Sequence, residues 1–447
     1  MKTSLAEHMT ARKLFLGALP SVFMMISISV YSVVDGFFVS NFAGKTSFAA
    51  VNLIYPLIMV IGSLGFMMGT GGAALVAKRL GEGDPERANR HFSNCVIFSL
   101  LLGILSSAIT YPLLPQIARW LGSDEEMLPY CVSYGRILVM GITAFNLQNL
   151  FQSFFMAAEK PTLGFLVTLL AGITNIVLDA ALIVGAKMGA VGAAIGTVSG
   201  QAVGAVIPLI YFSLPNKSRL RLAATRFEWK SLGKMAANGM SEFFNNVSAS
   251  AVSMVMNALL MKYYGQNGVS AYGIICYVWL IYAAVFIGFN MSVSARISFH
   301  YGAENKDELR SLYRKSLLIL LILGVVQTAL AEALAVPLSE AYAGYDPGLL
   351  DLTVKASRIY AFVYLFLGIN MFGSAFFTAL NNGVVSVFLA VTRLAALEIV
   401  CVVVLPLLVG GYGIFYGVVL AEGLGVFLNL GTMQAFASKY GYGGKKA

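Results

Sequence analysis

Long apolar runs are the feature that most limits what this chain can fold into. Twelve of them reach the length of about 20 residues that a helix needs to cross the hydrocarbon core of a bilayer. A backbone in lipid must satisfy its own hydrogen bonds, so continuous runs predict transmembrane helices, and the absence of period-two alternation excludes a transmembrane β-barrel. The predicted spans are 14–39, 48–76, 92–114, 130–157, 162–184, 191–213, 236–261, 269–295, 316–338, 354–379, 384–408 and 413–436.

Composition supports this fold class. Hydrophobic residues make up 58% of the 447 and charged residues only 11%, whereas a soluble domain carries about 25% charged residues. The four cysteines form no CxxC pair, and no cluster of His, Cys and carboxylates has metal-ligand spacing. We therefore expect an all-α membrane protein without a cofactor, a disulfide framework, a resident metal or a cleaved signal peptide.

The distribution of Lys and Arg predicts the orientation. If the N-terminus is cytoplasmic, most of the 30 basic residues fall in segments on the inside. Only Lys45, Arg119, Lys187 and Lys262 fall in segments on the outside. The positive-inside rule then predicts that both termini are cytoplasmic. The same rule explains the net charge of +9 by contact with lipid, which is favoured over nucleic-acid binding.

An internal repeat divides the chain into two halves of six spans. A shift of 221 residues places Gly192, Gly196, Gly200 and Gly204 on Gly413, Gly417, Ala421 and Gly425. Small residues at this spacing let another helix approach closely. The repeat predicts two bundles related by a pseudo-two-fold axis along the membrane normal, with lobes 1–213 and 236–447 and a cytoplasmic basic linker at 214–235.

The connecting segments carry no sign of catalysis. No GxxxxGK[ST] phosphate loop occurs, so any transport must draw its energy from an ion gradient or from a partner. The inside segments GEGDPERAN and AENKDELR have the polar residues typical of solvated helix starts. A membrane-embedded enzyme would need clustered Asp-rich or His motifs, and a channel would conduct without a gate; both alternatives are disfavoured.

Polar residues inside the first-half spans are the main candidates for function, because ionisable groups in a membrane are costly. Asp35 lies in span one, Asn175 and Asp179 lie one helical turn apart in span five, and Thr197 lies in span six. Asp35, Asp179 and Thr197 are expected at a similar depth in the outer half of the membrane, with Asn175 nearer the midplane. Their oxygens suit Na⁺, and two neighbouring carboxylates could instead share a proton. Ordinary hydrogen bonds to neighbouring helices are the alternative reading.

The second half lacks this set of residues but has charges of its own. The 221-residue shift places Asp35 and Asp179 on Met256 and Val400. Arg393 and Glu398 lie in span eleven and Glu422 in span twelve, so they are candidates for a substrate path. A satisfied interhelical hydrogen bond is the competing interpretation for Glu422.

The sequence resembles the multidrug and toxic compound extrusion (MATE) transporters, over nearly the whole chain. The resemblance rests on VDGFFVSNFAG after span one, GGAALVAKRLGEGDPERAN closing span two, and the six-plus-six layout. The DinF-like and MepA-like prokaryotic branches are the nearest, because Asn175-x-x-x-Asp179 and Thr197 are similar to the cation site of that branch. Another branch has acidic residues deep in its second lobe, and Glu242 does not match that position.

This resemblance implies an antiporter of the prokaryotic cytoplasmic membrane that exchanges H⁺ or Na⁺ for lipophilic, often cationic, organic compounds. It implies a cation site formed by Asp35, Asn175, Asp179 and Thr197, and it gives Pro20 the role of a bending point in span one. Ordinary tolerance of proline in membrane helices is equally compatible with Pro20. We expect a monomer. The alternative function is a lipid or lipid-linked oligosaccharide flippase of the same superfamily.

Overall fold

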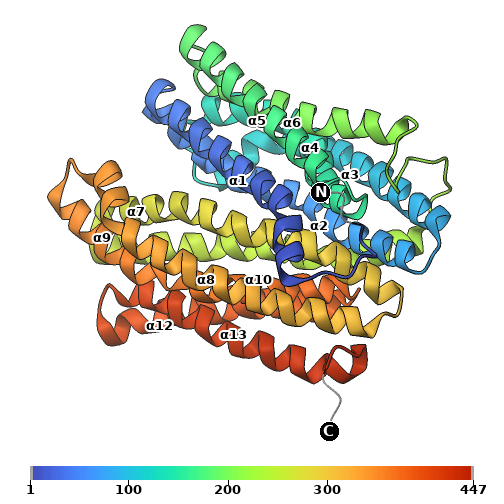
Figure 1. The fold of residues 1–447 in the computed structure, drawn as a ribbon. Helices are drawn as coiled ribbons and strands as arrows, with labels where there is room; N and C mark the ends of the chain where they lie inside the picture. The colour runs from blue at the N-terminus through green and yellow to red at the C-terminus, as the bar shows by residue number, and fades with distance from the viewer. Residues whose placement is uncertain (1–3, 444–447) are drawn as a thin grey trace.

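The structure is a computed structural model that describes residues 4–443. Every regular element within that range is helical (Figure 1). The first half contains α1 (Ala11–Phe42), α2 (Lys45–Gly81), α3 (Pro85–Trp120), α4 (Leu128–Ala157), α5 (Pro161–Asp179), the π-helix η1 (Ala180–Gly185) and α6 (Gly189–Ser213). The second contains α7 (Trp229–Gly302), α8 (Lys306–Ala343), α9 (Pro347–Ala361), α10 (Val363–Ala379), α11 (Gly383–Val391), the π-helix η2 (Thr392–Glu398), α12 (Ile399–Val409) and α13 (Gly413–Tyr440).

The element α7 is two spans rather than one. Its 74 residues would form a rod of about 110 Å at 1.5 Å per residue, against a hydrocarbon core of about 30 Å. At Gly265 the backbone leaves the helix with φ 61° and ψ −147°, a conformation that glycine adopts without a steric penalty. The two predicted spans 236–261 and 269–295 lie on either side of this break.

Three further spans are composite. The pair α9 and α10 forms one span bent by 46°. The π-helix η1 continues α5, and η2 joins α11 to α12. With these assignments the expected fold, twelve spans in two six-helix bundles, is confirmed. Figure 1 shows the first bundle, coloured blue to green, above the second, coloured yellow to red.

Side-chain caps start the helices that follow the predicted polar motifs. The Asp84 carboxylate accepts a hydrogen bond from the backbone N–H of Arg87, with Pro85 in the first turn of α3. Asn305 accepts one from the N–H of Glu308 at the start of α8. Both contacts satisfy an amide that has no partner within its helix, so the prediction of helix starts at these motifs is confirmed.

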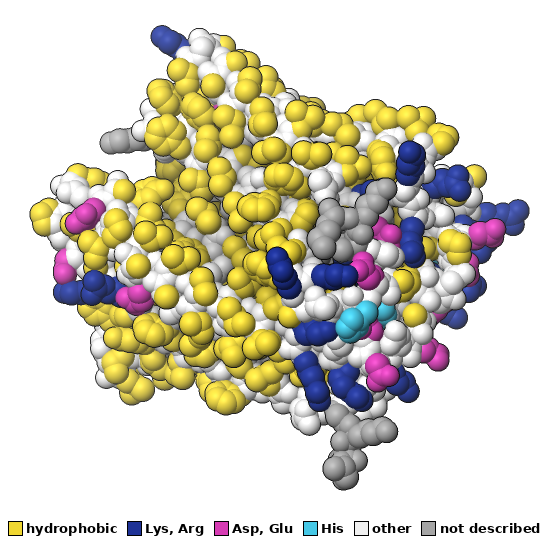
Figure 2. Space-filling view, viewed as in Figure 1, with side chains coloured by type: hydrophobic (Ala, Val, Ile, Leu, Met, Phe, Trp, Pro, Cys, Tyr) yellow, Lys and Arg dark blue, Asp and Glu magenta, His cyan; other side chains and the backbone are white. Residues whose placement is uncertain are grey.

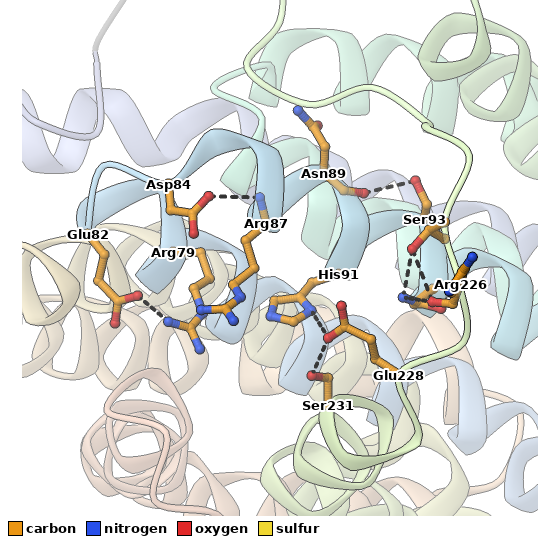
Figure 3. Close-up of polar contacts among 12 residues, drawn as sticks. Arg79, Glu82, Asp84, Arg87, Asn89, His91, Ser93, Arg226, Glu228 and Ser231 are labelled. Carbon is orange, nitrogen blue, oxygen red and sulfur yellow. Dashed lines mark hydrogen bonds and ion pairs between the residues drawn. The ribbon is translucent and has the colours of Figure 1, made fainter.

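The connection between the halves is shorter than predicted and lies on α3. Residues 214–228 are outside the helices, and the rest of the predicted linker forms the first turns of α7. The N–H of Arg221 donates to Asn89 Oδ1, and the N–H of Ala223 donates to Ser93 Oγ, both at 2.8 Å. Figure 3 shows this surface of α3, where His91 also faces Glu228.

One end of the molecule carries most of the visible basic side chains (Figure 2). We call it the basic end: it contains the α2–α3 turn, the α4–α5 turn, the linker and the α7–α8 turn. Apolar side chains cover the middle of this face, as expected for contact with lipid tails, and a smaller group of charged side chains lies at the opposite end.

The lobes are in backbone contact at the basic end. A Cβ atom added at Gly239 of α7 would lie 1.9 Å from the carbonyl oxygen of Met67 in α2. One added at Gly302 would lie 2.1 Å from the carbonyl oxygen of Lys78. No side chain fits at either position, so the small residues keep this end closed.

The segment Ser4–Met9, which we call the N-terminal strap, also joins the lobes at the basic end. The N–H of Leu5 donates to Glu159 in the α4–α5 turn, at 2.6 Å. The N–H of Met9 donates to Glu308 of α8, at 3.0 Å. The Leu5 side chain packs into a core cluster of the first lobe and Met9 into that of the second, so each end of the strap is anchored in a different bundle.

Candidate functional site

The structure brings the two predicted first-lobe acids together. Asp35 comes from the far half of α1, and Asp179 is the last residue of α5, directly before η1. Their carboxyl groups are near enough for each to be influenced by the charge of the other. Asp179 is fully buried, whereas Asp35 is partly accessible. The pair therefore forms an enclosed acidic site that has one accessible member.

Asn175 completes this cluster from one turn earlier on α5. Its side chain is 2% exposed and lies beside Asp179. The glycine row of α6 makes the space for both residues. A Cβ atom at Gly196 would lie 2.2 Å from Asp179 Oδ1, and one at Gly200 would lie 3.2 Å from the Cβ of Asn175. The repeated glycines thus admit polar side chains of α5 as well as its backbone.

Thr197 is beside the cluster rather than part of its hydrogen bonds. It follows Gly196, against which the Asp179 carboxylate lies. Its hydroxyl has no hydrogen-bond partner among the described residues. Three of the four predicted ligands are therefore in mutual contact, and the fourth is adjacent in sequence to their packing surface.

The acids lack hydrogen-bond donors. Asp35 Oδ1, both carboxylate oxygens of Asp179 and the Asn175 side-chain oxygen have no partner within residues 4–443. A buried ionised carboxylate without a donor or counterion is strongly unfavourable. A proton shared by the two acids, or a small cation held between their oxygens, removes this cost. The arrangement can thus bind either H⁺ or Na⁺.

Sequence reasoning did not select two residues that support Asp35. Tyr31, one turn before Asp35, shares a side-chain hydrogen bond with Gln148 of α4. Gln148 packs on Gly204, where an added Cβ would lie 2.8 Å from its Cδ. The available signal was a run of amides, Asn146 to Gln152, within an otherwise apolar span.

Pro20 lies in the other half of α1, where this helix contacts the second lobe. The helix continues through it. The next residue, Ser21, donates its hydroxyl hydrogen to carbonyl oxygens of Ala18 and of Gly288 in α7, each at 2.8 Å. Proline has no N–H, so it leaves a carbonyl of the preceding turn without its helical partner. Its role as a bending point remains a prediction.

The second-lobe charges divide into a pair and a single residue. Arg393 Nη1 donates to Glu422 Oε1 at 2.6 Å, and both side chains are buried. Asn370 donates to the other Glu422 oxygen and to the Glu422 carbonyl. The satisfied-contact interpretation of Glu422 therefore matches the geometry. Glu398 makes no hydrogen bond or ion pair within the described part of the chain.

No group of three or more His, Cys, Asp or Glu residues with metal-binding geometry occurs between residues 4 and 443. The first-lobe site has two carboxylates and an amide, an oxygen set suited to a weakly held monovalent cation.

The chain matches one protein family over both of its halves. The family model MatE covers residues 20–181 and 243–404. The two matched segments begin 223 residues apart, close to the 221-residue shift of the internal repeat, and each ends within the fifth span of its lobe.

Curated relatives cover almost the full chain. "Multidrug export protein MepA" of Staphylococcus haemolyticus (strain JCSC1435) is 23% identical over 412 residues, 92% of this chain and 90% of that protein. The protein of the same name from Staphylococcus aureus (strain NCTC 8325 / PS 47) is 21% identical over 411 residues, 91% and 90% of the two chains.

Solved structures share the fold. An outward-facing multidrug resistance MATE family transporter of the MOP superfamily superposes with a TM-score of 0.92, covering 97% of each chain at 20% identity. A MATE structure in a straight conformation gives a TM-score of 0.91, also over 97% of each chain at 20% identity.

Proposed function

Because the chain belongs to the MatE family, whose members are multidrug transporters and not enzymes, we propose that it is a secondary antiporter. It exports lipophilic, mostly cationic organic compounds in exchange for H⁺ or Na⁺. The protein is a multi-pass membrane protein. Its proposed location is a prokaryotic cytoplasmic membrane, with both termini and the basic end in the cytoplasm.

One observation carries the proposal: the first-lobe carboxylates face each other without donors. Asp35 and Asp179 can be neutralised only by something that enters from outside the protein. A site that must take up a cation, and that is partly accessible, suits coupling to an ion gradient. Asn175 contributes an oxygen to the proposed site, and Thr197, which is adjacent in sequence to Gly196, is its most weakly held member.

In the proposed cycle, binding of the cation and binding of the substrate favour different conformations of α1. Uptake of H⁺ or Na⁺ at Asp35 and Asp179 draws α1 toward α5 in the far half of the membrane. The N-terminal strap ties the start of α1, before Pro20, to both lobes. After Pro20, the hydroxyl groups of Ser21 and Ser29 donate to the carbonyl oxygens of Gly288 and Leu280 in α7. Bending at Pro20 would break these two hydrogen bonds and let the far half of α1 move while its start stays attached, which favours substrate release.

Fewer second-lobe charges are available to a substrate than the sequence suggested. Arg393 and Glu422 neutralise each other, so neither has a charge left for a substrate. Glu398 has no hydrogen-bond or ion-pair partner in the described chain. No partner beyond small organic compounds and lipid is required, and we propose that the transporter acts as a monomer.

The test is transport by purified protein in liposomes with separately imposed pH and Na⁺ gradients. Ethidium efflux should respond to at least one gradient. The double variant Asp35→Asn/Asp179→Asn should bind ethidium and keep its folded state, but its efflux should no longer respond to either gradient. Gradient-driven efflux by the double variant at the rate of the unmodified protein would refute the site.

A second measurement separates the coupling ions. If H⁺ is the coupling ion, efflux should continue in Na⁺-free buffer and stop when the pH gradient is collapsed. If Na⁺ is the coupling ion, the opposite pattern should appear. Efflux that needs neither gradient would contradict antiport.

A further inference from the structure

The linker between the two lobes is fixed to one face of α3. Arg90, Asn94 and Phe98 follow each other at intervals of four residues, so they share this face. The Asn94 side chain donates a hydrogen bond to the Arg226 carbonyl oxygen, at 3.2 Å. One turn further along α3, the ring of Phe98 lies 6.3 Å from the ring of Trp229, measured between centroids. These contacts give the end of the linker a defined position on α3.

Two aromatic side chains at this position remain exposed. Trp229 is 69% and Phe227 is 36% exposed, and their ring centroids are 5.3 Å apart. Neighbouring exposed rings are typical of a membrane contact. Trp120, 85% exposed at the other end of α3, is 22 residues from Phe98, or about 33 Å at 1.5 Å per residue. A hydrocarbon core is about 30 Å thick, so the two tryptophans mark its two surfaces.

Three basic side chains beside these rings are exposed and unpaired. Arg90, Arg226 and Lys230 have no ion pair and no side-chain hydrogen bond among the residues that the structure describes. Other basic residues at the basic end have acidic partners, as Arg79 has in Glu82. The unpaired charges are therefore available to a partner outside the chain.

The acids nearby do not neutralise these charges. Glu228, between the two aromatic residues, accepts a hydrogen bond from Ser231 Oγ at 2.9 Å and faces the buried ring of His91 at 3.7 Å (Figure 3). Glu86, one turn before Arg90 on α3, is exposed, and the two side chains form no ion pair within residues 4–443. This part of the surface thus keeps an excess of positive charge.

We propose that Arg90, Arg226, Phe227, Trp229 and Lys230, which we call the linker surface, bind anionic phospholipid. The basic side chains pair with the phosphate and the net negative charge of the headgroup. The rings cover the glycerol region and the first methylene groups of the chains. A free phosphate ion would engage the charges and leave the rings in water, whereas a phospholipid engages both.

The position of the linker surface gives the bound lipid a structural effect. Trp229 is the first residue of α7, and Gly239, ten residues later, makes the close backbone contact with Met67 of the first lobe. A lipid bound to both α3 and the first turn of α7 holds the start of α7 against the first lobe. Anionic lipid should therefore stabilise the closed arrangement of the basic end, whichever compound is transported.

The experiment measures the affinity of the purified full-length protein for the first bound lipid by native mass spectrometry. Dioleoylphosphatidylglycerol is the anionic probe, and dioleoylphosphatidylcholine has the same chains without the net charge. The triple variant Arg90→Gln/Arg226→Gln/Lys230→Gln should bind phosphatidylglycerol at least about tenfold more weakly, because charge-assisted contacts to the headgroup are lost. Its affinity for phosphatidylcholine should change less. Trp229→Ala should weaken the binding of both lipids.

A second triple variant controls for the net charge of the protein. Lys306→Gln/Arg314→Gln/Lys439→Gln removes three exposed basic side chains of the second lobe at the same end of the molecule, and it should leave phosphatidylglycerol binding unchanged. Equal losses of affinity in the two triple variants would overturn the linker surface. Glycerol 3-phosphate should not displace the lipid, because it has no chains to cover the rings; displacement would overturn the assignment to lipid.

Failure of the linker surface and failure of the proposed function give different results. Lipid binding is measured without a gradient, so it stands or falls whether or not the protein exports organic cations. The substituted basic side chains are exposed and unpaired, so the first triple variant should keep the melting temperature of the unmodified protein in detergent. Unchanged phosphatidylglycerol affinity in that folded variant would refute the linker surface and leave the transport proposal intact.

Discussion

The two lobes treat buried charge on their fifth and sixth spans in opposite ways. In the first lobe, Asp179 at the end of α5 lies on the glycine row of α6, and its oxygens have no donor. In the second lobe, Arg393 of η2 reaches across to Glu422 of α13, and Asn370 completes the contact. The first lobe leaves the Asp179 carboxylate without a partner, and the second pairs Arg393 with Glu422. An ion pair within a lobe stabilises that lobe, whereas an unpaired carboxylate must bind a cation from outside the protein.

The sharpest way to break this comparison is to neutralise one acid in each lobe. Asp179→Asn should reduce gradient-driven ethidium export in liposomes to the level of liposomes without protein, because the site can then no longer exchange its cation. Glu422→Gln should retain coupled export in the molecules that fold. Coupled export by Asp179→Asn, or its selective loss in Glu422→Gln, would show that the roles of the lobes are not divided in this way.

The effects on stability should be the reverse of those on transport: substitutions in the second-lobe pair should destabilise the protein more than substitution of Asp179. Arg393→Met leaves Glu422 buried without its counterion and should cost about 3–5 kcal/mol of unfolding free energy, measured by thermal or denaturant unfolding in detergent. The double variant Arg393→Met/Glu422→Leu should recover most of that loss, because no charge remains unpaired. Asp179→Asn should be neutral or stabilising. A large loss of stability on Asp179→Asn would indicate a partner for that carboxylate within the protein.

Equivalent glycines give a matched pair with smaller effects. A Cβ at Gly196 would meet the Asp179 carboxylate at 2.2 Å, so Gly196→Ala should displace this group and lower coupled export about 10- to 100-fold. A Cβ at Gly417 would meet the backbone of Cys401 at 2.8 Å. Gly417→Ala should therefore cost about 1–3 kcal/mol of stability and leave the gradient dependence intact. Equal effects of both variants on coupling would contradict the assignment.

The smallest effect is expected at Thr197. The repeat places it on Val418, so Thr197→Val installs the residue that the second lobe has at this position. Because its hydroxyl makes no contact with the acids, coupled export should change by less than about threefold, equivalent to less than about 0.7 kcal/mol. A loss as large as that of Asp179→Asn in a transport assay would place Thr197 directly in the cation site.

Much of this architecture follows from local pattern, and the exceptions have physical causes. Span number and the meeting of Asp35 with Asp179 follow from apolar length and from shared depth. The turn at Gly265 lies in the short polar segment between the seventh and eighth predicted spans, which contains Lys262, Gln266 and Asn267. A single glycine outside the helical conformation makes this turn, so the hydropathy pattern locates the boundary even though the helix α7 is continuous on both sides of it.

The pairing of second-lobe charges depended on distances that sequence spacing does not contain. Arg393 and Glu398 are five residues apart, and the π-helical winding between them changes which face each occupies. Only the structure shows that Arg393 selects Glu422 on α13 and leaves Glu398 alone. Likewise, the amides of span four gave no sign that Gln148 in particular would meet Tyr31.

The N-terminal strap has a consequence for the order in which the protein matures. The N–H of Met9 finds its acceptor 299 residues later in the chain, and Ser21 of the first helix waits for Gly288. At about 5–20 residues per second, a ribosome needs about 15–60 s to make that partner. The first helix to enter the membrane therefore stays without these contacts until the second bundle is inserted. The first residues to be synthesised therefore form these contacts only after about two-thirds of the chain has been translated.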